Sequence, residues 1–158
     1  VNGTYFYRVI AENGGGTSIG NIKTFTIGGS SPFVTWQQLN FGANANNPAI
    51  AGPDADPSGD GVPNLLKYAF GLDPLATSQS GVPTVQVTGG QVTLVYPRVT
   101  AASDLIYQAD WSTDLIDWRS TGFTETILSA ADGIEQVAAS LDSSSAPKRF
   151  VRIHVTFR

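Results

Sequence analysis

An acidic stretch at residues 54–64 constrains this chain more than any other part of its sequence. It reads DADPSGDGVPN and is followed at once by the apolar run LLKYAF. Acidic residues at alternate positions, closed by Asp60-Gly61, are typical of a loop that wraps a cation. Calcium takes about six to eight oxygen ligands, and a glycine permits the sharp turn that such a loop needs. The sequence therefore predicts a cation-binding loop joined to a short helix.

The candidate ligands follow from counting Asp56 as the first position of the loop. They are Asp54, Asp56, Ser58, Asp60, the backbone carbonyl of Val62, Asn64 and, beyond the helix, Asp73. The twelfth position, where a bidentate glutamate is usual, holds Lys67.

Two interpretations of Lys67 compete. In the first, calcium binds with the millimolar affinity of extracellular modules. In the second, the ammonium lies among the carboxylates and replaces the ion, because close carboxylates repel one another unless a cation is present. A solvated acidic turn that holds no ion is a further alternative. We expect calcium as the bound cofactor.

Composition excludes several classes of partner. The net charge is -4, the pI is about 4.7, and the nine Lys and Arg residues are scattered, so we expect no nucleic-acid partner. The chain has no Cys, which excludes a disulfide framework and a thiolate zinc site. No apolar run is long enough to span a bilayer, so we expect no membrane span.

Residues 1–29 show the period-two alternation of a β-hairpin, with a turn at the Asn-Gly-Gly-Gly of residues 13–16. The segments GTYFYRVIAEN and GTS resemble the last two strands of a fibronectin type III domain. That resemblance implies the tyrosine-corner position for Tyr5.

An isolated hairpin is marginal in water, so its apolar face must be covered. The residues predicted to make this contact are Tyr5, Tyr7, Val9 and Phe25. The cover is either the rest of this chain or another β-domain, including a second copy, that pairs by strand addition.

A helix is predicted from Pro32, because Phe33, Trp36 and Leu39 recur at helical spacing before Gly42. Residues 43–53 are predicted to be a loop. A second helix is predicted from Pro63 to residue 70, with Gly71 as its C-cap.

Residues 54–74 resemble the calcium loop of thrombospondin type 3 and dockerin-like modules. They are similar in particular to a module found near the C-termini of large secreted proteins of Verrucomicrobia and Planctomycetes. The resemblance implies a calcium-rigidified joint between β-domains, although Lys67 departs from the usual glutamate.

From residue 81 onward the sequence predicts a series of short strands. The first two form a hairpin around Gly89-Gly90, with Val85 and Val87 before the turn and Val92, Leu94 and Tyr96 after it. The other predicted strands are 105–111, 120–128, 134–141 and 149–157. Their number and spacing indicate a β-sandwich. Residues 107–118 and 147–153 resemble the terminal β-domain that follows the calcium loop in the same secreted proteins.

We therefore expect a mostly β protein with an immunoglobulin- or fibronectin-like β-sandwich. Its predicted parts are an incomplete fibronectin-like hairpin at 1–29, a helix–calcium loop–helix linker at 30–80 and the sandwich at 81–158.

We expect no catalysis. The single histidine, His154, falls on the polar face of the last predicted strand, and no nucleophile elbow or phosphate-binding glycine loop is present. Aspartates on one tight loop suit an ion better than the two carboxyl groups of a glycosidase.

The functional hypothesis is an extracellular or cell-surface structural module that associates by strand addition in a surface layer or fibre. The alternative is a C-terminal sorting or carbohydrate-binding domain of a larger secreted protein. In that case Trp118 would offer its ring to a polysaccharide.

Overall fold

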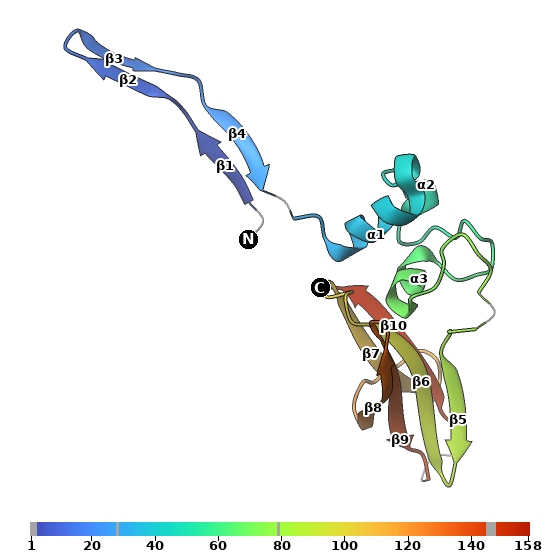
Figure 1. Cartoon of the computed structure of the whole chain (residues 1–158). Coiled ribbons are helices and arrows are strands. Elements are labelled where there is room, and N and C mark those ends of the chain that lie inside the picture. The colour runs from blue at the N-terminus through green and yellow to red at the C-terminus, as the bar shows by residue number, and fades with distance from the viewer. Residues whose placement is uncertain (1–2, 28, 79, 145–147) are drawn as a thin grey trace. The chain divides into compact units, whose positions relative to one another are not determined.

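The computed structural model describes residues 3–27, 29–78, 80–144 and 148–158 (Figure 1). The chain divides into two compact units, Val1–Ser31 and Pro32–Arg158. Antiparallel strands predominate and the helices are few and short, which confirms the predicted mostly β class. The predicted boundary near residue 30 lies at this division, and the one near residue 80 lies inside the second unit.

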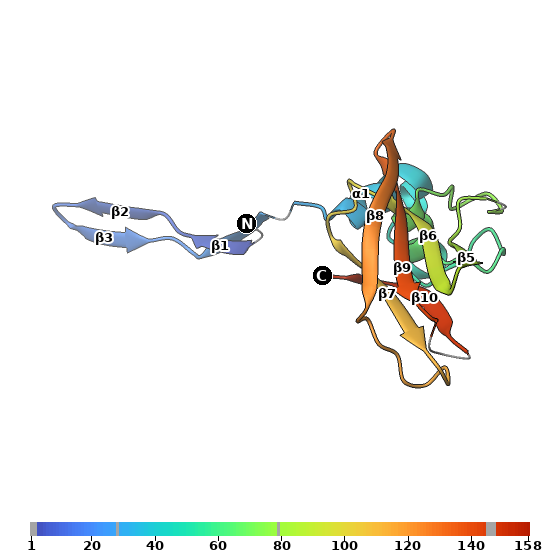
Figure 2. The ribbon, with the colours of Figure 1, turned by 90° about the horizontal axis from the view of Figure 1, so that it is seen from below.

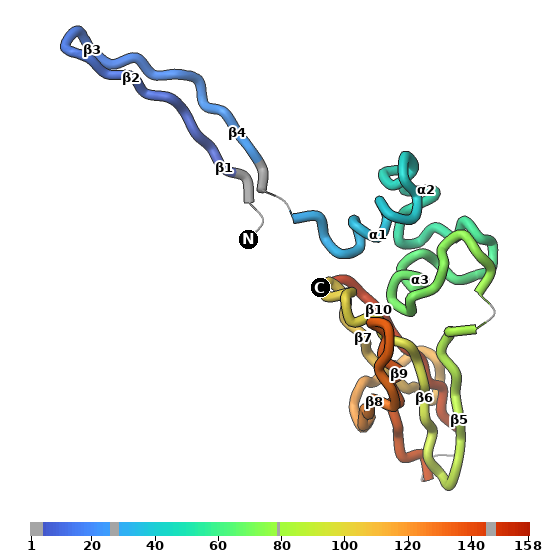
Figure 3. Tube along the Cα trace, viewed as in Figure 1, coloured from blue at the N-terminus to red at the C-terminus, as the bar shows by residue number. Residues whose placement is uncertain are grey.

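The first unit is a long hairpin whose pairing occurs in two stretches (Figure 3). The paired elements are β1 (Gly3–Tyr7) with β4 (Lys23–Ile27) and β2 (Ile10–Asn13) with β3 (Gly16–Ile19). Between them the N–H of Gly20 donates to the Val9 carbonyl at 2.8 Å. At the tip, the N–H of Gly15 donates to Asn13 Oδ1 at 2.8 Å, a turn contact typical of asparagine. The predicted hairpin is confirmed.

The second unit contains a four-stranded and a two-stranded antiparallel sheet. The larger has the order β5 (Thr84–Thr88), β6 (Gln91–Val99), β9 (Ile134–Asp142) and β8 (Phe123–Ala131). The smaller pairs β7 (Leu105–Ser112) with β10 (Phe150–Phe157). Strands β6, β9 and β8 run side by side in Figure 2. All the strands predicted beyond residue 81 are present, although the one expected from residue 120 begins at Phe123.

Side chains from both sheets share one core. Its buried members are Leu94, Tyr96, Ala109, Val137 and Ala139, which come from β6, β7 and β9. The hydroxyl of Tyr96 donates to Glu125 Oε1 at 2.8 Å, so this fully buried phenol has a partner.

Helices α1 (Pro32–Phe41) and α3 (Asn64–Phe70) lie at one end of these strands (Figure 1) and were both predicted. A second core cluster contains Phe33, Tyr68, Ala69, Phe70, Ala102, Leu105 and Val155. Because both helices and both strands of the smaller sheet contribute to it, the segments before and after residue 80 share one core. Leu39, the last member of the predicted apolar stripe, is 81% exposed instead.

The prediction of a loop at residues 43–53 is wrong. A 3-10 turn, η1 (Gly42–Asn44), and a short helix, α2 (Pro48–Ala51), lie there. The side chain of Asn47 caps α2 by accepting the N–H of Ala49 at 3.1 Å, and Pro48 occupies the first turn. The Asn-Pro pair was the signal for this helix start.

Asp104, which precedes β7, joins α1 to α3. Its Oδ2 accepts the backbone N–H of Phe33 at 2.9 Å, and its Oδ1 accepts the hydroxyl of Tyr68 at 2.7 Å. The first bond satisfies an N–H group that the start of a helix leaves unpaired. Burial, followed by this hydrogen bond, raises the pKa of Tyr68 well above its usual range.

We expect Asp104→Ala to lower the free energy of unfolding by about 1–3 kcal/mol, because two donors lose their acceptor. Tyr68→Phe removes only one of the two bonds, so its cost should be smaller. In urea unfolding, the double variant should lose less than the sum of the single losses. Additive losses would contradict a shared bond.

Candidate functional site

The side chain of Lys67 is fully buried at the centre of the acidic loop. It projects from α3, and its ammonium lies within hydrogen-bond distance of four oxygen atoms. These are Ser58 Oγ at 3.1 Å, Asp60 Oδ2 at 2.7 Å, the Asp73 carbonyl at 3.3 Å and the Ala76 carbonyl at 2.7 Å. A buried ammonium is strongly disfavoured unless it is paired and hydrogen-bonded, so these oxygens make its position tolerable.

Asp60 supplies the counter-charge, and its side chain is 3% exposed. Besides Lys67, its Oδ2 accepts the N–H of Ser78 at 2.6 Å, and its Oδ1 accepts the N–H of Val62 at 2.9 Å. These bonds favour the ionised form of the carboxyl group. The bond from Lys67 is the largest cause and holds the pKa of Asp60 well below its usual range.

Asp56 shapes the loop from within. Its carboxylate accepts the backbone N–H groups of Gly59, Asp60 and Gly61 at 2.9, 3.3 and 2.7 Å, and the Ser58 hydroxyl at 3.0 Å. The bond from Gly61 is the largest cause of the lowered pKa of Asp56. Both carboxylate oxygens of Asp56, which was predicted to bind an ion, therefore accept hydrogen bonds from the loop itself.

The remaining predicted ligands lie apart from the ammonium or reach it by other atoms. Asp54 is exposed. Asp73 contributes its carbonyl, while its carboxylate accepts the N–H of Leu75 at 2.8 Å. Val62, whose carbonyl was the predicted ligand, donates its N–H to Asp60.

Asn64 is fully buried and ties α3 to α2. Its Nδ2 donates to the carbonyls of Ile50 and Gly52, both at 2.9 Å. Its side chain therefore positions the start of the helix that carries Lys67.

The segment after α3 closes the site, and of its contributing residues sequence reasoning named Asp73 but missed Ala76 and Ser78. Gly71 ends the helix at a φ of 71°, and a side chain there would collide with Ile134. The chain then returns over Lys67, where it presents the Ala76 carbonyl and the Ser78 N–H. Both are backbone groups, which no residue type marks in advance. The one signal was the Gly71 to Pro74 stretch, which predicts a sharp reversal.

This arrangement does not fit a calcium ion beside the ammonium. Only Ser58 and Asp60 of the predicted ligands bring a side-chain oxygen to the centre, and Lys67 occupies the point on which the four oxygens converge. In the part of the chain that the structure describes, no three His, Cys, Asp or Glu side chains gather as a metal site. The geometry thus favours the second interpretation of Lys67, in which the ammonium replaces calcium, over the first.

The residues predicted to contact a partner lie together on the hairpin. The ring of Phe25 stacks on Tyr5 with centroids 5.4 Å apart and meets the edge of Tyr7 at 6.1 Å. Val9 lies between β1 and β2 and is 70% exposed.

Trp118, the candidate sugar platform, is half-buried and packs against an arginine. The Arg152 guanidinium lies 3.9 Å from its ring centroid, and its indole N–H donates to the Leu115 carbonyl at 3.2 Å. Trp111 is covered in the same way by Arg149, at 4.4 Å. These rings contribute to packing, and carbohydrate binding stays a prediction.

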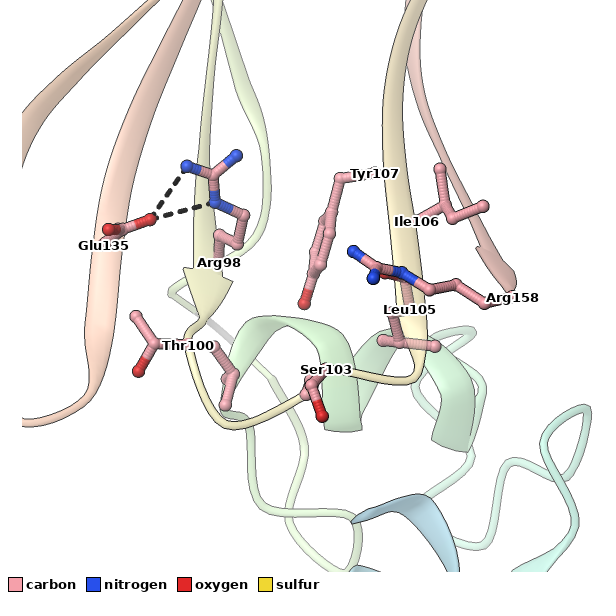
Figure 4. Close-up of a pocket in the computed structure, with 10 residues that line it drawn as sticks. Arg98, Thr100, Ser103, Leu105, Ile106, Tyr107, Glu135 and Arg158 are labelled. Carbon is pink, nitrogen blue, oxygen red and sulfur yellow. Dashed lines mark hydrogen bonds and ion pairs between the residues drawn. The ribbon is translucent and has the colours of Figure 1, made fainter. Parts of the chain in front are cut away.

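A surface hollow of about 480 Å³ lies beside β7 (Figure 4). In its lining, the guanidinium of Arg98 pairs with Glu135 at 2.8 Å, and the hydroxyl of Tyr107 donates to the Ala69 carbonyl at 2.8 Å. Burial is the main cause that raises the pKa of Tyr107 to about 12. These groups serve contacts within the chain, and we assign them no acid–base role.

No protein-family model, curated protein or solved structure matches this chain. Among the residues described, every helix is too short or too polar to cross a membrane.

Proposed function

We propose that this chain is a non-catalytic structural module of the cell surface or extracellular space that assembles through its N-terminal hairpin. The observation that carries the proposal is the exposure of large apolar side chains in the first unit. Between 41% and 71% of the surface remains exposed for Tyr5, Phe6, Tyr7, Val9, Ile10, Ile19, Ile22 and Phe25. Apolar surface gathered in this way marks an interaction site.

The strand edges of the hairpin support the same proposal. Among the described residues, β1 pairs only with β4 and β2 only with β3, so each strand has one outer edge. Unpaired edges are templates for pairing with another chain. A strand added at either edge gains main-chain hydrogen bonds, and its side chains pack beside the apolar side chains of the hairpin. The partner is another β-domain, in the simplest case a second copy of this chain.

The second unit suits a rigid support in such an assembly. Its two sheets share one core, which favours a small β-sandwich, and its loop is held by the buried pair of Lys67 and Asp60. The resemblance of residues 54–74 to loops of secreted proteins supports the extracellular location. No step of this function requires a reaction at the hollow beside β7.

Light scattering after size-exclusion chromatography tests the assembly. We expect the unmodified chain to form dimers or larger species at high micromolar concentration. The variant Phe6→Lys, Val9→Lys should weaken association by about tenfold or more, because charges along this side of the hairpin oppose pairing.

The control is Ile116→Lys, which charges an apolar position of the second unit that is even more exposed, at 81%. It should associate like the unmodified chain. A strictly monomeric unmodified chain, or equal weakening by the control, would overturn assembly through the hairpin.

A further inference from the structure

We propose that the side-chain ammonium of Lys67 has the structural role that a bound metal ion has in other loops of this kind. We also propose that the substitution Lys67→Glu turns the loop into a calcium site. Neither part depends on assembly through the hairpin.

The oxygens around Lys67 are of the kinds that calcium also binds, although they number only four. One carboxylate, one hydroxyl and two backbone carbonyls face the ammonium, and calcium takes oxygens of these kinds. They come from the segments before and after α3 in the sequence, since Ser58 and Asp60 precede the helix while Asp73 and Ala76 follow it. The ammonium thus joins the loop to the segment that returns over it.

More oxygens lie near the ammonium than it has N–H donors. An ammonium has three N–H donors, so it cannot give each of four oxygens a bond of its own. Three contacts lie between 2.7 and 3.1 Å, and the fourth, to the Asp73 carbonyl, is 3.3 Å. Such convergence suits a spherical cation with several ligands.

Charge explains why one lysine is enough in the natural chain. Among the described residues, Asp60 is the one carboxylate that forms an ion pair with the ammonium, so the buried pair is neutral. Calcium in place of the ammonium would leave an excess positive charge beside Asp60. Because the ammonium is part of the chain, its effective concentration at the site is also very high. Free calcium therefore does not displace it.

Lys67→Glu removes the ammonium that competes with calcium and makes the site more negative. The introduced carboxylate adds a second negative charge, so a divalent ion restores neutrality. A bidentate glutamate brings two oxygens to the four already present, which reaches the lower limit of about six for calcium. Its oxygens also end one bond closer to the backbone than the ammonium does, which leaves room for an ion at the centre.

Thermal unfolding with about 5 mM calcium or with EDTA tests the proposal, with the variants Lys67→Glu and Lys67→Met. For the unmodified chain, and separately for Lys67→Met, we expect the Tm in calcium to equal the Tm in EDTA. Lys67→Glu should be stabilised by calcium by about 5 °C or more and should bind one equivalent in calorimetry. Magnesium should stabilise it less, because it demands a tighter octahedral site.

A calcium-dependent Tm of the unmodified chain would overturn the proposal, as would a folded Lys67→Glu that ignores calcium. If Lys67→Glu does not fold, the unmodified chain is treated in EDTA with an amine-reactive reagent. Mass spectrometry then measures the rate at which each lysine is modified. Exposed Lys23 and Lys148 are internal controls. We expect Lys67 to react at least about tenfold more slowly than either, because its ammonium is buried and hydrogen-bonded. Equal rates would overturn the proposal.

Discussion

Lys67→Met is expected to lower the unfolding temperature of the second unit by on the order of 10 °C. Methionine fills nearly the same space, so the apolar stem of the side chain is largely replaced. The substitution removes the positive charge and leaves Asp60 buried without its partner. The carbonyl of Ala76 also loses its donor. Breaking a buried pair in this way is strongly destabilising, and calorimetry or circular dichroism would measure the shift.

Lys148→Met is the matched control, because it makes the same chemical change at an exposed lysine of the same unit. The Nζ of Lys148 lies 4.5 Å from the ring centroid of Phe150, a contact of small value at the surface. Its Tm should change by less than about 3 °C. If both variants unfolded at the temperature of the unmodified chain, Lys67 would not hold the loop.

Phe70→Ala is expected to cost about 3–5 kcal/mol of the free energy of unfolding. Phe70 is the last residue of α3, is 3% exposed and belongs to the core cluster that joins the helices to the smaller sheet. Truncation leaves a cavity at the point where this helix is anchored. Because the same helix carries Lys67, the anchor also fixes the position of the ammonium. Denaturant unfolding of the whole chain would measure the loss.

The comparison for this variant is Phe6→Ala, which removes the same ring from a position that is 71% exposed. Unfolding of the second unit should change by less than about 0.5 kcal/mol, since Phe6 belongs to the first unit. A cost as large as that of Phe70→Ala would contradict this account of the core.

The strands and turns were predictable because their signals are local. Alternating apolar residues and the Gly89-Gly90 turn mark β5 and β6 without knowledge of their neighbours. The pairing of β6 with β9 and the separate pairing of β7 with β10 were not predictable in this way. These pairs join segments far apart in the chain, and similar apolar faces fit more than one order.

The site was predictable to a similar extent. The acidic and glycine pattern correctly located a tight loop before a helix, in which Asp60 and Ser58 contact the Lys67 ammonium where a metal ion was expected. It could not show that Asp56 is occupied by backbone N–H groups, or that Ala76 closes the site. The role of Asp104 was not predictable either, because it accepts a hydrogen bond from Phe33, which lies 71 residues away in the sequence.

The two outer edges of the hairpin differ in sequence, since β1 and β2 form one and β3 and β4 the other. Contact between like edges of two copies is related by a twofold axis and closes at a dimer. Contact between unlike edges is head-to-tail, and unless a rotation brings the ends together it leaves one edge open at each end. In that geometry the average length increases with concentration and has no fixed stoichiometry. The symmetry of edge pairing therefore decides whether this module terminates its own growth.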